Sequence, residues 1–179
     1  PRSIKFLERV NHPSVPTIYP PMAQYVFLTV HFFQPDSILA MRMAFLILDV
    51  LALFFIIGIL VKLDLNINMS GVYFWCPLII KETFNSTHLD IIGISFLCGS
   101  IYFLVHNRHT LATFFLAMGF LGKLYPAILL PLYVQACFQQ CKKTEENPWR
   151  IPIVNTLFFV VVIILGYIPF MGIGLHMFD

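Results

Sequence analysis

The chain has 179 residues, of which 59% are hydrophobic and 11% are charged, whereas a typical soluble domain carries roughly 25% charged residues. A formal net charge of +2, spread along the chain, excludes a nucleic-acid-binding protein with a clustered basic face. An aromatic content of 16% and a mean hydropathy of +0.83 exclude a disordered chain. The composition therefore indicates an all-α, polytopic membrane protein.

Long apolar stretches with few charged residues predict about six membrane-spanning helices. Residues 39–61 are long enough to cross a bilayer core of about 30 Å as one helix. Apolar stretches follow at 71–81, 91–105, 110–138 and 151–170. The stretch 71–81 is too short to cross unless its flanks extend the helix.

The basic residues predict how the spans are oriented. Lys62, Arg108 and the group Lys142, Lys143 and Arg150 lie in three separate loops, 62–70, 106–109 and 139–150, and the positive-inside rule places all three loops in the cytoplasm. Because the last two loops share a side only if the chain crosses twice between them, we expect two helices, 110–122 and 125–138, with a turn between them.

This orientation places residues 1–38, 81–90, 122–126 and 171–179 on the non-cytoplasmic side. These segments hold most of the unusual polar residues of the chain, so we expect a working site on an external or periplasmic face. The prediction is one membrane domain over 1–179, with an external loop at 1–38, a bundle at 39–170 and the start of another external loop at 171–179. We expect a multi-pass protein of the inner cell membrane.

A short apolar stretch at 22–33 predicts a further helix near the N-terminus. Its length suits a helix lying at the membrane interface better than one that spans it. Pro20 and Pro21 precede the stretch, and proline is accepted in the first turn of a helix.

The segment 81–90 is the densest polar cluster. Lys81 is a candidate for neutralising a phosphate, and Glu82, His88 and Asp90 are candidates for a base or for ligands of sugar hydroxyls. Two alternatives stay open: the segment is a solvated external loop, and Asp90 caps the helix that follows. His88 and Asp90 are too few to predict a metal site.

Ionisable residues inside apolar stretches are costly and are kept for pairing or function. Arg42 either faces a phosphate or anchors its helix at the interface, and we expect Asp49 to pair within the bundle. Lys123 either meets an anion or snorkels to the surface. Together with Tyr125 and Pro126 it forms a predicted tight polar turn.

Three segments resemble motifs of a known family and occur in the same order along the chain. They are N-H-P followed by P-T-I-Y-P-P-M-A-Q at 11–24, W-C-P-L-I-I-K-E followed by S-T-H-L-D at 75–90, and G-K-L-Y-P followed by L-L-P at 122–131. The chain resembles bacterial membrane glycosyltransferases of superfamily C, and within it the polyprenyl-phosphate-mannose-dependent alpha-mannosyltransferases. The resemblance covers roughly residues 9–133.

The chain departs from that family's pattern at identifiable places. Cys76 stands where the family usually has Asn, and Thr87 stands where Gly commonly precedes the histidine. The family's first transmembrane helix and the acidic motif of its first external loop would lie upstream of Pro1. The resemblance therefore implies a fragment whose catalytic base precedes Pro1, with further spans after Asp179, and implies that this fragment alone is inactive.

The resemblance implies transfer of a sugar, with inversion, from a polyprenyl-phosphate donor to a glycan or lipid-linked acceptor. Cations at the membrane face would stabilise the phosphate leaving group, and polar groups would hold the hydroxyls. The expected substrate-binding residues are Tyr19, Gln24, Arg42, Lys81, Glu82, His88, Asp90, Lys123 and Tyr125. The catalytic residue is not identified. No cofactor is required by these residues, and a divalent cation is left open.

Two other classes of function compete with this prediction. A broken helix near Lys123 would suit a transporter or a non-catalytic membrane subunit. Against that interpretation, the polar groups gather on one face instead of at the midplane, and the sequence shows no inverted repeat. The third alternative is an inactive truncated relative. The donor sugar and the acceptor cannot be identified from these residues.

Overall fold

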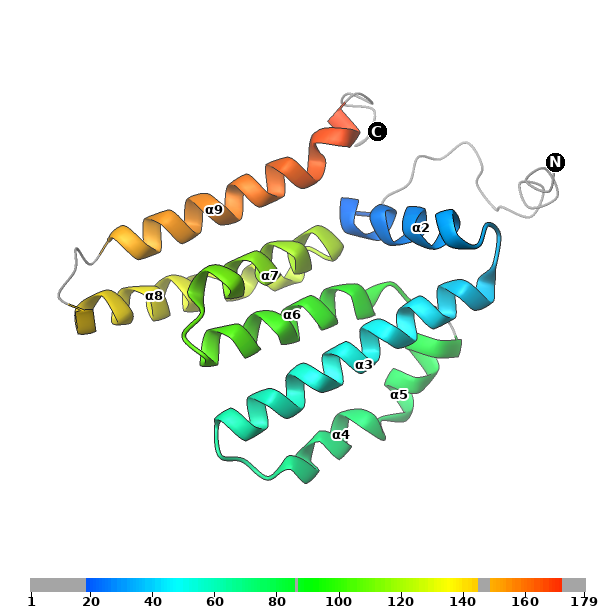
Figure 1. Cartoon of the computed structure of the whole chain (residues 1–179), viewed down its shortest axis with the longest axis horizontal. Coiled ribbons are helices and arrows are strands. Elements are labelled where there is room, and N and C mark those ends of the chain that lie inside the picture. The colour runs from blue at the N-terminus through cyan, green and yellow to red at the C-terminus, as the bar shows by residue number, and fades with distance from the viewer. Residues whose placement is uncertain (1–18, 86, 145–148, 172–179) are drawn as a thin grey trace.

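The computed structural model describes residues 19–85, 87–144 and 149–171, and every element assigned in these ranges is a helix (Figure 1). The all-α class is therefore confirmed. The first family-like motif, at 11–13, lies outside the described residues, as do Ser86 and the loop residues 145–148.

The first two helices match their sequence predictions closely. Helix α2, Pro21–Phe33, begins with proline at its first position, where a missing N–H costs no hydrogen bond. Helix α3, Ile38–Lys62, begins at Ser37, whose side chain accepts a hydrogen bond from the N–H of Ala40. The predicted helix at 22–33 is thus confirmed as a helix, while its position at a membrane surface stays a prediction.

The segment after α3 is broken into short helices instead of forming one span. It consists of the 3-10 turn η1, Ile67–Met69, helix α4, Ser70–Phe74, helix α5, Pro77–Ile79, and the π-helical segment η2, Ile80–Asn85. The break between α4 and α5 falls directly before Pro77. Proline lacks the N–H of a regular helix and disfavours helical backbone in the preceding residue, so the helix stops there.

The remaining helices confirm that 110–138 is divided. Helix α6, Asp90–Val105, is followed by α7, His109–Gly122, and the helical path breaks at Lys123. The 3-10 segment η3, Tyr125–Leu129, leads into α8, Leu130–Thr144, and α9, Arg150–Tyr167, comes last.

The predicted set of six long spans is not seen in the described residues. Two segments, Ile38–Lys62 and Arg150–Met171, are long and apolar enough to cross a membrane, while α6 and α7 are shorter apolar helices. A straight crossing requires about 20 residues, which α6, α7 and the broken segment 67–85 do not provide. The predicted bounds of α6 and α7 agree with the structure to within a residue. The prediction of about six spans is not confirmed because these helices are short and because the stretch 71–81 breaks before Pro77.

The two long helices expose most of their apolar surface. Only 22% of the apolar window of α3 and 17% of that of α9 is buried, and side chains such as Ile47, Phe54 and Leu157 are largely exposed. A core helix of a soluble protein would be mostly buried, so this exposure fits helices that face lipid.

The ends of the helices collect in two groups (Figure 1). Helix α2, the beginnings of α3 and α6, and the ends of α7 and α9 lie at one end of the molecule. The end of α3, the α6–α7 turn, the end of α8 and the beginning of α9 lie at the other. The segments around 81–90 and 122–126, which the basic loops assign to one side, therefore do share one end of the fold.

Two apolar clusters hold the bundle together. Near the first end, Ala23, Phe45 and Ile92 join α2, α3 and α6. Farther along, Leu116, Tyr133 and Phe159 join α7, α8 and α9. Apolar burial of this kind contributes roughly 25 cal/mol per Å² when the apolar surface comes out of water, whereas helices already in lipid associate mainly through close packing.

Buried hydrogen bonds reinforce these contacts. Ser100 Oγ donates to the carbonyl oxygen of Ala112 at 2.7 Å and also contacts the hydroxyl of Tyr133. Thr113 Oγ1 donates to Asn155 Oδ1 at 3.3 Å. Polar pairs between apolar helices fix the register of the helices, because each group would otherwise be left unsatisfied.

Candidate functional site

A cavity of about 380 Å³ lies at the end of the bundle where α2, α3, α6 and α7 meet. We call it the site cavity. Its lining residues are Tyr19, Phe27, Met41, Phe45, Thr87, His88, Leu89, Asp90 and Lys123. Four of the predicted substrate-binding residues, Tyr19, His88, Asp90 and Lys123, thus line the same cavity.

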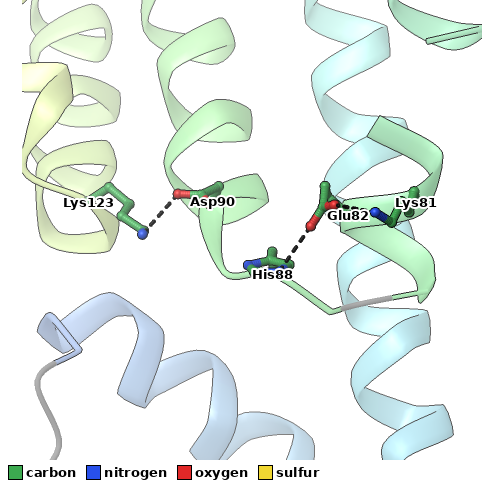
Figure 2. Close-up of polar contacts among 5 residues, drawn as sticks. All are labelled: Lys81, Glu82, His88, Asp90 and Lys123. Atoms are coloured by element: carbon green, nitrogen blue, oxygen red, sulfur yellow. Dashed lines mark ion pairs between the residues drawn. The ribbon is translucent and has the colours of Figure 1, made fainter. Parts of the chain in front are cut away.

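An ion pair crosses this cavity between two separate turns. Lys123 Nζ lies 2.9 Å from Asp90 Oδ1 (Figure 2). Asp90 is the first residue of α6, and Lys123 follows the last residue of α7 with extended backbone, which turns its side chain toward α6. The helix begins after Leu89, which provides no capping side chain, so the alternative of Asp90 as the capping residue is not seen. Its carboxylate is held by Lys123 instead.

A second polar contact lies beside the first. His88 Nε2 is 3.0 Å from Glu82 Oε2, and the backbone N–H of His88 donates to the carbonyl oxygen of Glu82 at 2.9 Å (Figure 2). Lys81 Nζ lies 3.6 Å from the other carboxylate oxygen of Glu82. The turn after η2 therefore folds back on Glu82 and brings its side chain next to the site cavity.

The backbone in this turn carries an unusual conformation. Thr87 has a φ of 53°, in the left-handed region that favours glycine. This is the position where the family pattern has Gly before the histidine. The departure noted in the sequence therefore places a β-branched residue in a strained conformation next to His88.

A glycine on α6 makes room for the turn that carries Lys123. A Cβ atom on Gly93 would lie 3.0 Å from the Tyr125 hydroxyl oxygen and 3.2 Å from Lys123 Cβ. Contacts this short would force Tyr125 and Lys123 to shift by a few tenths of an ångström, so the glycine lets that turn approach α6 closely. Tyr125, a predicted site residue, is partly exposed and lies against this glycine.

An apolar groove of about 680 Å³ adjoins the site cavity. It runs between α2 and the beginning of α3, and Phe27, Met41 and Thr87 line both spaces. Leu28 and Ile38 add exposed apolar surface. Polar side chains come from Gln24, His31, Gln34, Asp36 and Ser37. Gln24 therefore lines this groove and is not among the described residues that line the site cavity.

The other predicted residues lie nearby. Arg42 is half-buried in the second turn of α3, and the described linings of the groove and the site cavity do not include it. The side chain of Lys81 is 68% exposed and points to Glu82. The predicted pairing of Asp49 is confirmed, because the Tyr73 hydroxyl donates to Asp49 Oδ1 at 2.6 Å.

Several residues at the site could not be recognised as site residues from the sequence. Phe27, Met41 and Phe45 look like ordinary apolar helix residues, and Gly93 looks like any glycine in an apolar stretch. Thr87 did carry a signal, since it stands where glycine is common. Among the residues described by the structure, no group of three or more His, Cys, Asp or Glu side chains is placed to hold a metal ion.

The described residues form an all-helical protein with two long, largely exposed apolar helices that could span a membrane, and a cavity lined by charged side chains at one end of the bundle. The sequence model of glycosyltransferase family 87 matches residues 17–177, which is most of the chain. The chain therefore belongs to glycosyltransferase family 87, a membrane-associated family. No curated protein and no solved structure matches the chain significantly.

Proposed function

We propose that the site cavity binds the phosphate and sugar of a polyprenyl-phosphate-linked sugar, and that the sugar passes to an acceptor hydroxyl. One observation carries the proposal: Lys123, a cation between apolar helices, reaches the site cavity and is held there 2.9 Å from Asp90. The family match supports sugar transfer, and the resemblance to mannosyltransferases favours mannose as the sugar.

Lys123 is suited to receive a phosphate. Its side chain is 34% exposed and that of Asp90 is 52% exposed, and ion pairs of that exposure contribute only about 0–1 kcal/mol. An incoming phosphate can therefore replace the carboxylate with little loss. A charge-assisted hydrogen bond to the phosphate stabilises it by roughly 1.5–3 kcal/mol. Arg42 and Lys81 are the further cations of this end of the bundle.

The transfer step displaces the phosphate. The acceptor hydroxyl oxygen attacks the anomeric carbon, a new C–O bond forms, and the bond between that carbon and the phosphate oxygen breaks. The hydroxyl proton passes to a carboxylate base. The polyprenyl phosphate leaves with an added negative charge, which Lys123 stabilises.

The remaining polar groups around the site cavity suit the sugar. His88 and Glu82 hold each other at 3.0 Å, which fixes both side chains for hydrogen bonding to hydroxyl groups. Asp90 is freed for the same task when Lys123 turns to the phosphate, and Tyr19 closes the cavity on the side of α2. The prenyl chain lies in the adjoining apolar groove, and Gln24 lies along that path.

The membrane sidedness follows from charge. Lys62 and Arg108 belong to the end of the bundle opposite the site cavity (Figure 1), and basic loops stay in the cytoplasm. We therefore place the site cavity on the external or periplasmic face of the inner cell membrane, where a glycan or lipid-linked acceptor reaches it.

The donor can be tested with purified full-length protein and radiolabelled sugars. We expect transfer from a polyprenyl-phosphate sugar and no direct transfer from a nucleotide sugar. A chemically matched control is the same sugar on a short water-soluble alkyl phosphate, which lacks the chain that the groove would bind and should work poorly. Efficient transfer from a nucleotide sugar without a lipid carrier would contradict the proposal.

A further inference from the structure

The opposite end of the bundle carries a second polar cavity, of about 620 Å³, between the beginnings of α7 and α9. We call it the opposite cavity. Its lining includes Arg108, His109, Thr110, Arg150, Val154 and Asn155. Two arginines from separate parts of the chain thus line one cavity, and no Asp or Glu is among the described residues that line it. The candidate site lies at the far end of the same helices (Figure 1).

The backbone adds to the positive potential of this cavity. Helices α7 and α9 both begin there, and neither has a capping side chain among the residues that the structure describes. The N-terminal end of a helix carries a partial positive charge and unbonded N–H groups that favour an anion. Asn107, with a φ of 59°, turns the chain sharply so that Arg108 stands directly at the start of α7.

Apolar side chains form the rest of the wall. Leu111 lies in the first turn of α7, two residues after its start, and Ile151 lies one residue after the start of α9. Val154 follows one turn later in α9, with 58% of its surface exposed. Helix α9 is one of the two helices long and apolar enough to span a membrane. When it spans the bilayer, its first turn lies where lipid headgroups meet the acyl chains. A free phosphate would make no use of these apolar groups, whereas a phospholipid would cover them.

We propose that the opposite cavity binds the headgroup phosphate of an anionic phospholipid in the leaflet at that end of the bundle. Arg108 and Arg150 hold the phosphate oxygens, since guanidinium groups match a phosphate with two parallel hydrogen bonds. The acyl chain lies along Leu111 and Val154. Basic pockets between membrane helices bind anionic headgroups in this way. The lipid is bound at a site separate from the sugar donor, so this proposal does not depend on the proposed reaction.

The test uses the full-length protein in detergent, titrated with phosphatidylglycerol and followed by native mass spectrometry. We expect phosphatidylglycerol to bind more tightly than phosphatidylcholine, and Arg108→Gln to weaken binding about tenfold, the effect of one lost charge-assisted contact. Arg150→Gln should weaken it similarly, which gives a second test if one variant fails to fold. Lys62→Gln is the matched control, because it removes an exposed cation at the same end that does not line the opposite cavity.

Three results would overturn the proposal. Equal binding of phosphatidylglycerol and phosphatidylcholine would show that the site does not recognise the net negative charge of the headgroup, because both lipids carry the same phosphate and only phosphatidylcholine balances it with a cation. Equal weakening by Lys62→Gln and Arg108→Gln would show a diffuse charge effect instead of a site. Displacement of bound phosphatidylglycerol by millimolar inorganic phosphate would show a site for the free ion instead of a lipid.

Discussion

Lys123 Nζ lies 2.9 Å from Asp90 Oδ1, and this contact joins the turn after α7 to the first turn of α6. Both residues line the site cavity with part of their surface exposed. An exposed pair of this kind adds little to stability. Its significance is that it holds a cation and a carboxylate in fixed positions at the place where we propose that the sugar phosphate binds.

Lys123→Ala should lower sugar transfer by about 10- to 100-fold in the full-length protein, because one charge-assisted hydrogen bond to the leaving phosphate is lost. Lys123→Arg should retain more activity, since the charge persists with a different geometry. The measurement is initial transfer rate per amount of folded enzyme. Unchanged activity in Lys123→Ala would leave this lysine as a surface anchor.

Asp90→Asn distinguishes two roles of the Lys123–Asp90 pair: phosphate binding by Lys123, and the ion pair itself. If Lys123 acts on the phosphate, Asp90→Asn should cost less activity than Lys123→Ala, because the amide still positions the lysine and binds hydroxyls. The double variant should then lose about as much as Lys123→Ala alone. Equal losses in both single variants, with no further loss in the double variant, would indicate that only the ion pair matters.

Gly93→Ala should lower transfer at least severalfold with the fold retained. The new Cβ atom would lie 3.0 Å from the Tyr125 hydroxyl and 3.2 Å from Lys123 Cβ, so the turn must move by a few tenths of an ångström. A displacement of about 1 Å can cost as much as 100-fold in rate. Gly71→Ala is the control, since a Cβ atom there would meet a Trp75 side-chain carbon at an ordinary contact distance of 3.8 Å. Equal activity of the two variants would contradict the role assigned to Gly93.

Thr87→Gly should leave the free energy of unfolding unchanged or raise it by up to about 1 kcal/mol. Left-handed backbone costs a non-glycine residue roughly 1–2 kcal/mol, and the greater freedom of unfolded glycine takes back about 0.5–1 kcal/mol. Thr110→Gly, in the first turn of α7, should destabilise the protein by up to about 1 kcal/mol. Thermal unfolding in one detergent compares them, and a clear loss in Thr87→Gly would show that its side chain contributes more than its backbone strain costs.

Tyr73→Phe should destabilise the protein by about 1–3 kcal/mol, because Asp49 loses the hydroxyl that donates to it at 2.6 Å. This hydrogen bond ties the broken segment after η1 to the long helix α3. Tyr102→Phe is a matched control, since among the described residues its hydroxyl has no hydrogen-bond partner and only its ring packs. Denaturation curves that coincide for the two variants would argue against the contact.

Single cysteines should report the membrane sides. In a variant without its native cysteines, Asn66→Cys and Asn107→Cys should react with an impermeant reagent only from the cytoplasm. Asp36→Cys and Leu124→Cys should react only from outside. The grouping rests on the two ends of the bundle (Figure 1), and the direction rests on the basic loops. Labelling of positions 66 and 124 from the same side would contradict the arrangement.

The amino-acid sequence by itself determined the helical class and much of the order of the elements. Apolar length alone placed α3 within a residue of its observed bounds. The parity of the basic loops required a break between α7 and α8, and the break is found at Lys123. These features follow from hydrophobic length, proline positions and charge distribution, which are local properties of the chain.

The tertiary structure decided which polar groups meet. Nothing in the local pattern states that Lys123 contacts Asp90, that His88 folds back on Glu82, or that Gly93 makes room for Tyr125. Such contacts depend on how helices pack against one another, because residues distant along the chain become neighbours only after several turns have set their relative positions.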